Sequence, residues 1–537
     1  MLHRRTLATT LTGVLLLTAC GTERAATLGV DTRRADPGQH AVAITEEEPV
    51  AAVTPSGHAE EDAAGSPPTR IDQPPPPPRA TPGGVTFQHS GVNPVVVTAQ
   101  DARSTFALDV DTASYNVGRA WIEQGLTPDP ASVRVEEWVN YFDQNYPAPE
   151  DGTFAVYADG APHTLAGTES FLLRIGVAAK AADEERLPLN LSFVVDTSGS
   201  MSNGNRIALV REAISSTVAS LDERDLVSIV GYDDQATTWL PPTGGDQLHR
   251  IRAAVEHLVP GGSTNAEVGL RRGYTLVDEM WQADRVNRVI LLSDGVANVG
   301  TTDPDGLLAE IERATTRDIH LIAVGVGFGN FNDQLLEQLA DRGDGWYTYL
   351  DSSSEARNVF GDQLDGLRAT VARDARIQVV FDEDTVESYR LIGFENREIA
   401  DKAFRSDGVD AGEVGAGHTV TALYELELEP GVRAGDGAHL ATAHLRWIDP
   451  ASGEVDEIDG AVTTDALTSS FDQASAHYRF TAAVATTAEI LRGSDHVDAA
   501  DLGAIVKAAR RAASDIDADQ AWSFTELIAE LSDRMGR

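Results

Sequence analysis

Short apolar runs alternate with amphipathic segments along residues 191–371, and this alternation limits the possible folds more than any other feature of the chain. Within 205–221, apolar residues recur at helical spacing, at Ile207, Val210, Ile214, Val218 and Leu221. Short apolar strands separated by such helices are buried on both faces, so we predict an α/β architecture with a doubly wound parallel sheet. Its strands are predicted at 191–196, 226–232, 286–292, 319–326 and 346–350, with a short edge piece at 237–240.

The regions on either side of this sheet follow other patterns. Residues 153–157 and 170–177 alternate like strands, and a period of two returns after Arg376, as in "HTVTALYELEL". Because the first two strands are too few for a stable sheet, we expect the α/β domain to be inserted into a β-sandwich built from both flanks. Helices are predicted at 114–123, 130–142, 471–491, 499–511 and 521–534, with Asp111 or Thr112 as the cap of the first.

The N-terminal residues predict export and membrane attachment. Arg4 and Arg5 precede an apolar run that ends at Ala19, too short to span a membrane, so residues 1–19 are interpreted as a signal peptide. The next residue, Cys20, is the only cysteine, and "LTACG" around it resembles the lipobox of bacterial lipoproteins. This resemblance implies a lipid anchor on Cys20 and a place on the extracytoplasmic face of the cell membrane. The Pro-rich residues 20–93 predict a disordered linker.

Charge and motifs exclude several classes of protein. The formal net charge of −42 opposes binding to nucleic acid and to anionic lipid, so membrane contact is expected through the anchor only. Each lysine is followed by alanine, which excludes a Walker A loop, and we expect no nucleotide. His320, inside an apolar strand, is interpreted as a satisfied core residue. The glycines of "AVGVGFGNF" (323–331) are interpreted as close packing where a strand ends.

Three stretches place oxygen-bearing side chains at the ends of predicted strands or in the loops beside them. They are "VVDTSGSMS" (194–202), "PGGSTNAEVGL" (260–270) and "VILLSDGVANVG" (289–300). Ligand sites of α/β sheets form where the carboxyl ends of the strands meet. Carboxylate and hydroxyl oxygens without histidine or cysteine suit a hard divalent cation, Mg²⁺ or another such as Mn²⁺ or Ca²⁺.

Asp196-x-Ser198-x-Ser200, followed by Thr264 and Asp294, resembles the metal-ion-dependent adhesion site of von Willebrand factor type A (VWA) domains. The resemblance implies that the three hydroxyls bind the ion directly or nearly so and that the two carboxylates act largely through water. It leaves one coordination position for an Asp or Glu side chain of a protein partner, and it implies no catalytic residue and no enzyme.

Two departures from the VWA pattern accompany this resemblance. Glu267 stands where a small residue is expected, and no Asp-Asp pair follows Ser200 to form an adjacent second metal site. Beyond the VWA motif, residues 104–149, "GAGHTVTALYELE" (415–427) and the helical tail resemble the flanking regions of a YfbK-like subgroup of bacterial VWA lipoproteins, so the resemblance covers roughly residues 100–537.

The predicted organisation is a signal peptide (1–19), a linker (20–93), an N-terminal VWA-associated region (94–180), a VWA domain (185–371), a β-rich region (372–465) and a helical C-terminal region (466–537). The expected function is that of a cell-envelope lipoprotein whose VWA domain binds a protein partner through a metal ion. Two alternatives stay open. One is a metal-assisted hydrolase, which needs a general base or a cationic group that the three loops do not supply. The other is an architectural envelope protein with a vestigial site.

Overall fold

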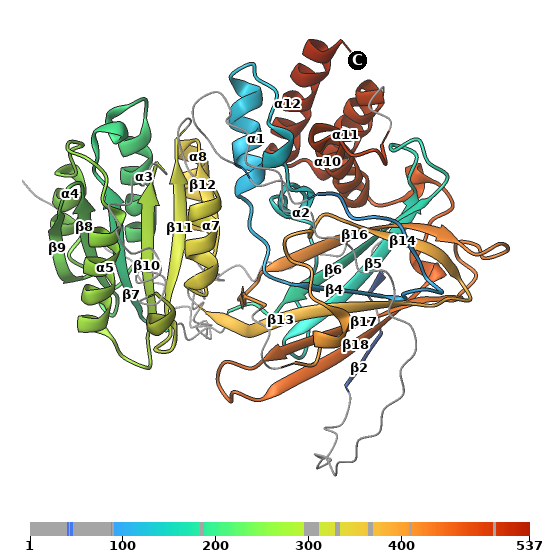
Figure 1. Ribbon diagram of the computed structural model, residues 1–537, viewed down its shortest axis with the longest axis horizontal. Coiled ribbons are helices and arrows are strands. Elements are labelled where there is room, and N and C mark those ends of the chain that lie inside the picture. Colours follow the sequence, from blue (N-terminus) through green and yellow to red (C-terminus); the bar gives the residue numbers. More distant parts are fainter. Residues whose placement is uncertain are drawn as a thin grey trace, which may run out of the picture. The chain divides into compact units, whose positions relative to one another are not determined.

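A computed structural model describes most of the chain from Gly91 onward and a few residues before it. The predicted signal peptide, Cys20 and most of the predicted linker lie outside the described residues. The described strands form three sheets, and the C-terminal residues form a group of helices (Figure 1). The described residues are 40–41, 43–46, 87, 91–182, 187–294, 311–327, 333–362, 369–406, 411–497 and 501–536.

One sheet contains the strands predicted for the α/β domain, in the order β12-β11-β10-β7-β8-β9. Its strands run parallel except for the edge strand β9, which is antiparallel to β8 and longer than the predicted edge piece. The predicted doubly wound parallel sheet is therefore confirmed. The strands are β7 (Leu189–Asp196), β8 (Leu226–Tyr232), β9 (Ala236–Gly244), β10 (Val286–Ser293), β11 (Ile319–Val326) and β12 (Tyr347–Leu350).

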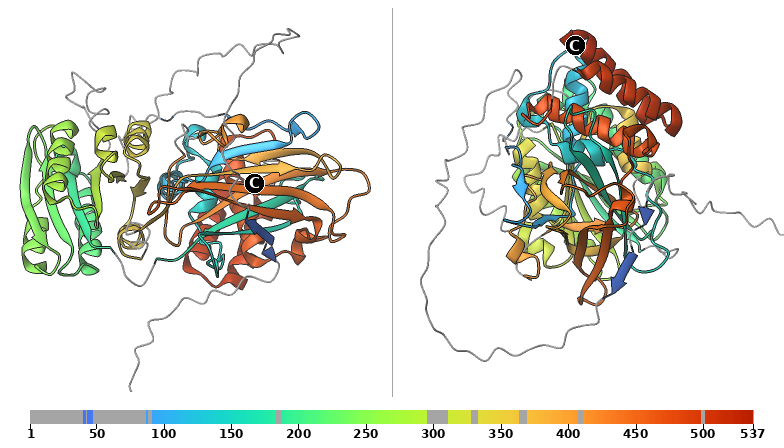
Figure 2. Two further views of the ribbon diagram at one scale, coloured as in Figure 1. Left: turned by 90° about the horizontal axis from the view of Figure 1, so that it is seen from below. Right: turned by 90° about the vertical axis from the view of Figure 1, so that its right-hand side faces the viewer.

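Helices cover both faces of this sheet (Figure 1, Figure 2). On β7, Phe193 and Val195 pack into one apolar cluster, whereas Val194 packs into the cluster on the opposite face. All three side chains are fully buried, which explains why these three consecutive residues are all apolar. The first face is covered by α3 (Arg206–Ala219), α4 (Leu248–Glu256), α8 (Ser353–Arg357) and the π-helical turn η3 (Asn358–Asp362), and the second by α5 (Ala266–Met280) and α7 (Asp333–Arg342).

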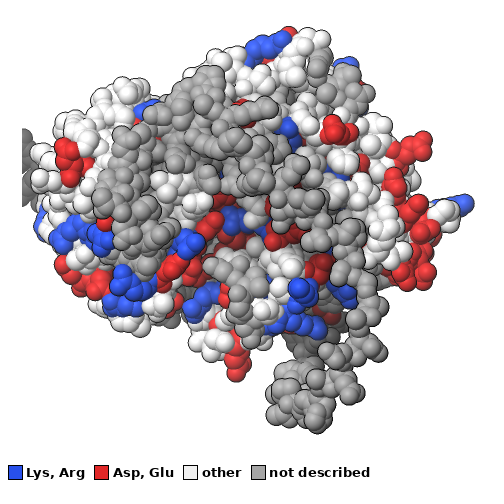
Figure 3. All heavy atoms as spheres, viewed as in Figure 1, with Lys and Arg blue, Asp and Glu red and all other residues white. Residues whose placement is uncertain are grey.

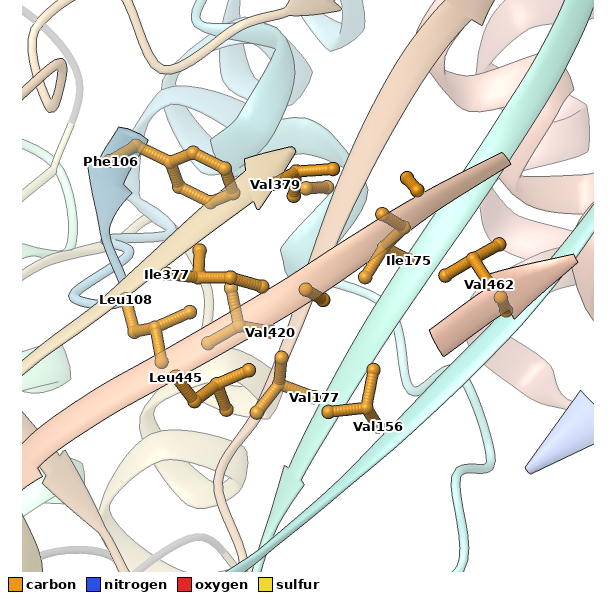
Figure 4. Packing of buried hydrophobic residues seen from close by; sticks show 14 of the residues in the cluster. Phe106, Leu108, Val156, Ile175, Val177, Ile377, Val379, Val420, Leu445 and Val462 are labelled. Carbon is orange, nitrogen blue, oxygen red and sulfur yellow. The ribbon is translucent and has the colours of Figure 1, made fainter. Parts of the chain in front are cut away.

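The other two sheets form a β-sandwich, in which Val156 and Ile175 of one sheet face the same apolar core as Ile377 and Leu445 of the other (Figure 4). The first sheet has the order β1-β5-β6-β16-β14-β3, and the second the order β15-β13-β17-β18-β2, with β4 paired to β13. The strands are β1 (His40–Ala41), β2 (Ala43–Glu46), β3 (Val96–Val97), β4 (Arg103–Ala107), β5 (Phe154–Pro162), β6 (Phe171–Ala179), β13 (Thr370–Phe381), β14 (Val386–Ile392), β15 (Glu413–Gly415), β16 (Thr419–Leu428), β17 (His439–Ile448) and β18 (Val455–Thr463).

The predicted insertion of the VWA domain into this sandwich is confirmed by one strand pair. Strand β6 precedes the domain and β16 follows it, and the two pair antiparallel with Thr419 opposite Ala178. The chain therefore leaves the sandwich after β6, forms the α/β domain, and returns to complete the same sheet.

Part of the region predicted as a disordered linker is ordered. Strand β1 pairs with β5 and strand β2 pairs with β18, and the Phe87 side chain is buried in the apolar cluster beneath α5 and α7. The prediction of disorder throughout 20–93 is therefore wrong at these residues. The edges of the two sandwich sheets offer unpaired backbone groups, which an extended segment satisfies whatever its composition.

The N-terminal region contains α1 (Ala113–Glu123), the 3-10 turn η1 (Pro130–Ser132) and α2 (Val135–Asn140). The predicted continuous helix over 130–142 is wrong, because Val133 and Arg134 are extended between the two pieces. Thr112, one of the two predicted caps, occupies the N-cap position of α1, but its side chain makes no capping hydrogen bond. Asp111 instead accepts the backbone N–H of Tyr347 at 2.8 Å and a guanidinium N–H of Arg397 at 2.7 Å.

The C-terminal region consists of α10 (Ala476–Arg492), α11 (Leu502–Ile516) and α12 (Asp519–Met535). The predicted first helix begins later than expected, because Ser475 caps α10 by accepting the backbone N–H of Tyr478 at 3.1 Å. Short 3-10 turns lie at η4 (Asp401–Ala403), η5 (Thr464–Ala466) and η6 (Phe471–Gln473). On the face of the molecule in Figure 3, acidic and basic side chains are interspersed.

Candidate functional site

Two of the three predicted stretches leave the sheet from adjacent parallel strands. Asp196 is the last residue of β7, and Asp294 directly follows β10. These strands are paired in register, with Val195 opposite Leu292, so both carboxylates emerge at the same edge of the sheet. After Asp196 the chain enters the 3-10 turn η2 (Gly199–Ser202), which carries Ser200.

Short hydrogen bonds hold the first stretch together. Asp196 Oδ1 accepts the backbone N–H of Ser198 at 2.8 Å, and Asp196 Oδ2 accepts the hydroxyl of Ser293 at 2.9 Å. The hydroxyl oxygens of Ser198 and Ser200 are 2.9 Å apart. Burial raises the pKa of Asp196 to about 6, although the hydrogen bonds from Ser198 oppose this rise, and the nearby charge of Asp294 adds to it.

Thr264 lies on the loop between α4 and α5, which backbone hydrogen bonds fasten to the first stretch. Gly261 donates its N–H to the carbonyl of Thr197 at 2.7 Å, and Gly199 donates to the carbonyl of Gly262 at 3.1 Å. The Thr264 side chain is half-buried, two residues before α5 begins. Direct side-chain contacts therefore link Asp196, Ser198 and Ser200, whereas Thr264 is linked to them through the backbone of its loop.

Asp294 is the most unusual residue of the site. Only 1% of its surface is exposed, and its Oδ2 accepts a guanidinium N–H of Arg206 at 2.5 Å. Its Oδ1 is buried and has no hydrogen-bond partner among the described residues. A buried carboxylate oxygen without a partner is costly, and a cation or a donor beside it removes that cost. The set of carboxylate and hydroxyl oxygens fits a hard divalent cation, and the orphaned Oδ1 is the clearest sign of this fit. The rest of the third stretch, 295–300, lies outside the described residues.

Arg206 was not predicted from the sequence as part of the site, because it lies on a helix and not on one of the three loops. It is the first residue of α3, and its guanidinium also donates to the backbone carbonyl of Ser200 at 3.2 Å. The signal in the sequence was indirect. Gly327, interpreted as a point of close packing, lies where a side chain would collide with the Cγ atom of Arg206.

Among the described residues, two other groups of side chains have the spacing of metal ligands, and arginines form ion pairs with the carboxylates of each. In the group of His320, Asp344 and Glu413, Glu413 Oε2 lies 3.2 Å from His320 Nδ1 and 3.9 Å from Arg288. His320 also lies 2.8 Å from the carbonyl of Asp344, which supports its interpretation as a satisfied core residue. Burial, together with Arg288, lowers the pKa of His320, and burial raises that of Glu413 to about 7.

The second group contains Asp111, Glu137 and Glu337. Arg134 pairs with Glu137 at 3.0 Å and with Glu337 at 2.8 Å, and Arg397 pairs with Asp111. Both groups therefore join elements of the α/β domain to its flanks through ion pairs, and neither lies at the edge of the sheet that carries Asp196 and Asp294.

Comparison with known families covers most of the chain. A model described as von Willebrand factor type A domain matches residues 190–362, a model described as von Willebrand factor matches 82–172, and a model described as the C-terminal region of uncharacterized protein YfbK matches 367–533. The uncharacterized protein YfbK of Escherichia coli is 34% identical over 478 residues, which cover 84% of this chain and 82% of that protein.

More distant relatives share only part of the chain. Human inter-alpha-trypsin inhibitor heavy chain H4 is 29% identical over 226 residues, which cover 38% of this chain and 23% of that protein. Among solved structures, a von Willebrand factor type A protein from Catenulispora acidiphila is similar with a TM-score of 0.40 and 15% identity, over 68% of this chain and 87% of that one.

Proposed function

This chain belongs to the YfbK family of proteins with a VWA domain, and we propose that its VWA domain binds a protein partner through a divalent metal ion. VWA domains typically mediate protein–protein interactions. Asp196, Ser198, Ser200, Thr264 and Asp294 are the proposed metal-binding residues. The observation that carries the proposal is the buried Oδ1 of Asp294, which has no partner among the described residues and lies at the same sheet edge as Asp196 and its two serine hydroxyls.

The composition of the site favours binding over catalysis. Two carboxylates and three neutral hydroxyls do not fill the coordination shell of a divalent ion. The open position can therefore bind an Asp or Glu side chain of the partner. Mg²⁺ is the first choice for this ion, and Mn²⁺ or Ca²⁺ are the others. The cationic group that a hydrolase would need is present in Arg206, but its guanidinium is already bonded to Asp294 and to the carbonyl of Ser200. We therefore propose an interaction protein without enzyme activity.

We further propose that Cys20 carries a lipid that tethers the protein to the extracytoplasmic face of the cell membrane. This rests on the sequence "LTACG" after the apolar run that ends at Ala19. None of the helices among the described residues combines the length and apolar character needed to cross a membrane.

The test of the proposed site is Mn²⁺ binding to the full chain, purified in detergent and followed by calorimetry. Wild-type protein is expected to bind one ion, Ser198→Ala to bind it more weakly, and Asp294→Asn to lose it. Ser354→Ala, which removes a hydroxyl of the same kind on α8, is the matched control. Equal binding by all four proteins would refute the site.

Partner binding is tested separately, by crosslinking in native membranes with Mg²⁺ and with EDTA. A crosslinked partner protein that appears with Mg²⁺, disappears with EDTA and is absent for Ser198→Ala supports the proposal. A partner retained equally in EDTA would place protein binding elsewhere on the chain.

A further inference from the structure

Arg206 reaches from the start of α3 into the proposed metal site and touches two of its three stretches. Its Nη1 atom donates to Asp294 Oδ2 at 2.5 Å and to the carbonyl oxygen of Ser200 at 3.2 Å. A positive charge therefore lies within the group of residues proposed to hold a cation, and it repels that cation.

The fold holds Arg206 in this position. Only 8% of the residue is exposed, and its aliphatic stem lies against Gly327, the residue that follows β11. Gly327 has a φ of +74°, and a Cβ atom there would collide with the Cγ atom of Arg206. Glycine is thus favoured at position 327 both by the backbone conformation and by the close approach of the arginine.

The arginine also makes the two carboxylate oxygens of Asp294 different. Oδ2 is taken by the guanidinium, while Oδ1 stays buried without a partner among the described residues. Arg206 thereby fixes which carboxylate oxygen is left for a metal ion. It also offsets one of the two negative charges that Asp196 and Asp294 supply.

We propose that Arg206 is the internal counter-cation of the metal site and sets its preference for acidic partners. The inference rests on the proposed function and adds a residue to it. With the charge of Asp294 offset, Asp196 and Asp294 do not neutralise a divalent ion, and a carboxylate from the partner does. Arg206 therefore weakens the binding of the metal alone and strengthens the binding of an acidic ligand to the metal-loaded site.

These two effects have opposite signs, which separates this role from a purely structural one. Loss of a structural arginine would weaken metal and ligand binding together. Loss of a counter-cation tightens metal binding and weakens the response to a carboxylate. A neighbouring arginine lowers the pKa of a carboxyl by about 1–3 units, which means that the carboxylate binds a proton about ten- to a thousandfold more weakly. A metal ion is repelled in the same way, so we expect the loss of Arg206 to raise the metal affinity by about tenfold or more.

The experiment measures Mn²⁺ binding to the full chain in detergent, for wild type, Arg206→Gln, Arg206→Met and Arg206→Lys. Arg206→Met keeps an apolar stem against Gly327, and either neutral variant suffices if the other fails to fold. The matched control is Arg224→Gln, which removes an exposed arginine from the loop before β8, at the opposite end of the sheet. Both neutral variants are expected to bind Mn²⁺ about tenfold more tightly than wild type, while Arg206→Lys and Arg224→Gln stay near wild type.

Acetate is then added as the carboxylate probe, with its own binding of Mn²⁺ subtracted. Acetate is expected to tighten Mn²⁺ binding to wild type and to have a smaller effect on Arg206→Gln. If folded neutral variants bind Mn²⁺ with unchanged or lower affinity, the counter-cation role is overturned, while the proposed site stands as long as Asp294→Asn loses the ion. If wild type itself binds no Mn²⁺, the proposed function and the inference both fail.

Discussion

Arg119 of α1 forms a bidentate ion pair with Asp351, the residue that follows β12, with N···O distances of 2.7 and 2.6 Å. The same guanidinium lies 3.4 Å from Glu355 of α8, which also accepts the hydroxyl of Tyr141 at 2.6 Å. All of these side chains are largely buried. The N-terminal region is thus joined to the last strand and helix of the VWA domain by charges that have little access to water.

Breaking this ion pair is expected to destabilise the protein. Asp351→Asn leaves Arg119 without its main partner, and removing one member of a buried pair lowers the free energy of unfolding by about 3 kcal/mol. Urea unfolding measures the loss. Arg357→Gln breaks the exposed pair of Arg357 with Glu212 and is expected to cost less than about 1 kcal/mol. Equal, small effects of both changes would contradict the importance assigned to Arg119 and Asp351.

Asp196 gives the metal-free protein a defined pH dependence. Its pKa is raised to about 6 in the folded state, so the folded protein holds a proton at this carboxyl that the unfolded chain has lost. The protonated Asp196 therefore stabilises the folded state. Its contribution to the free energy of unfolding is complete below the unfolded pKa of about 4 and is lost as the pH rises through about 6. In EDTA at pH 7.5, Asp196→Asn is therefore expected to be more stable than wild type by about 2–3 kcal/mol, and the difference should shrink at pH 4.

Added Mg²⁺ provides the internal check on this prediction. Mg²⁺ binds the charged carboxylate of wild type more tightly than the neutral amide of Asp196→Asn, so it stabilises wild type more. At pH 7.5 it should therefore narrow or reverse the difference in stability between the two proteins. Chemical unfolding at both pH values, with EDTA and with Mg²⁺, measures all four cases. A wild-type protein as stable as Asp196→Asn in EDTA at pH 7.5 would contradict the raised pKa.

Gly118 in α1 tests whether packing or helix propensity decides stability in the N-terminal region. In an exposed helix, alanine in place of glycine stabilises by about 1 kcal/mol. At Gly118 a Cβ atom would collide with the indole of Trp138, which is fully buried. Gly118→Ala is therefore expected to destabilise by about 1–3 kcal/mol. Thermal unfolding measures both changes. Gly503→Ala in α11, where a Cβ atom would meet nothing within 4 Å, is the control and should be neutral or slightly stabilising.

Cys20→Ser is expected to release the protein from membranes, because serine cannot carry the thioether-linked lipid. Cell fractionation with a high-salt wash measures how much of each protein stays in the membrane fraction. The net charge of −42 opposes electrostatic binding to anionic lipid, so a variant that remained in the membrane fraction would show that another attachment exists.

The strands of the VWA sheet and the positions of Asp196 and Asp294 at strand ends could be predicted from the sequence alone. The apolar residues Phe193, Val194 and Val195 are buried on both faces of the sheet, and such a run fits few structures other than a central parallel strand. Because β7 and β10 are parallel, residues at their carboxyl ends meet at one edge whatever the remaining contacts are. Local patterns of this kind depend on neighbours along the chain, which the sequence displays directly.

The partners of buried polar groups, in contrast, could not be predicted without the folded structure. Asp111 looked like a helix cap but accepts bonds from Tyr347 and Arg397, more than 200 residues away in the chain. Arg206 lies within a helix predicted from its apolar spacing, yet it bonds Asp294, 88 positions later, because β10 lies beside β7 and α3 starts at the same edge. A charged side chain carries no periodic signal of its own. Its role is set by the opposite charge that the folded chain brings within hydrogen-bonding distance, and that distance depends on the path of the whole backbone.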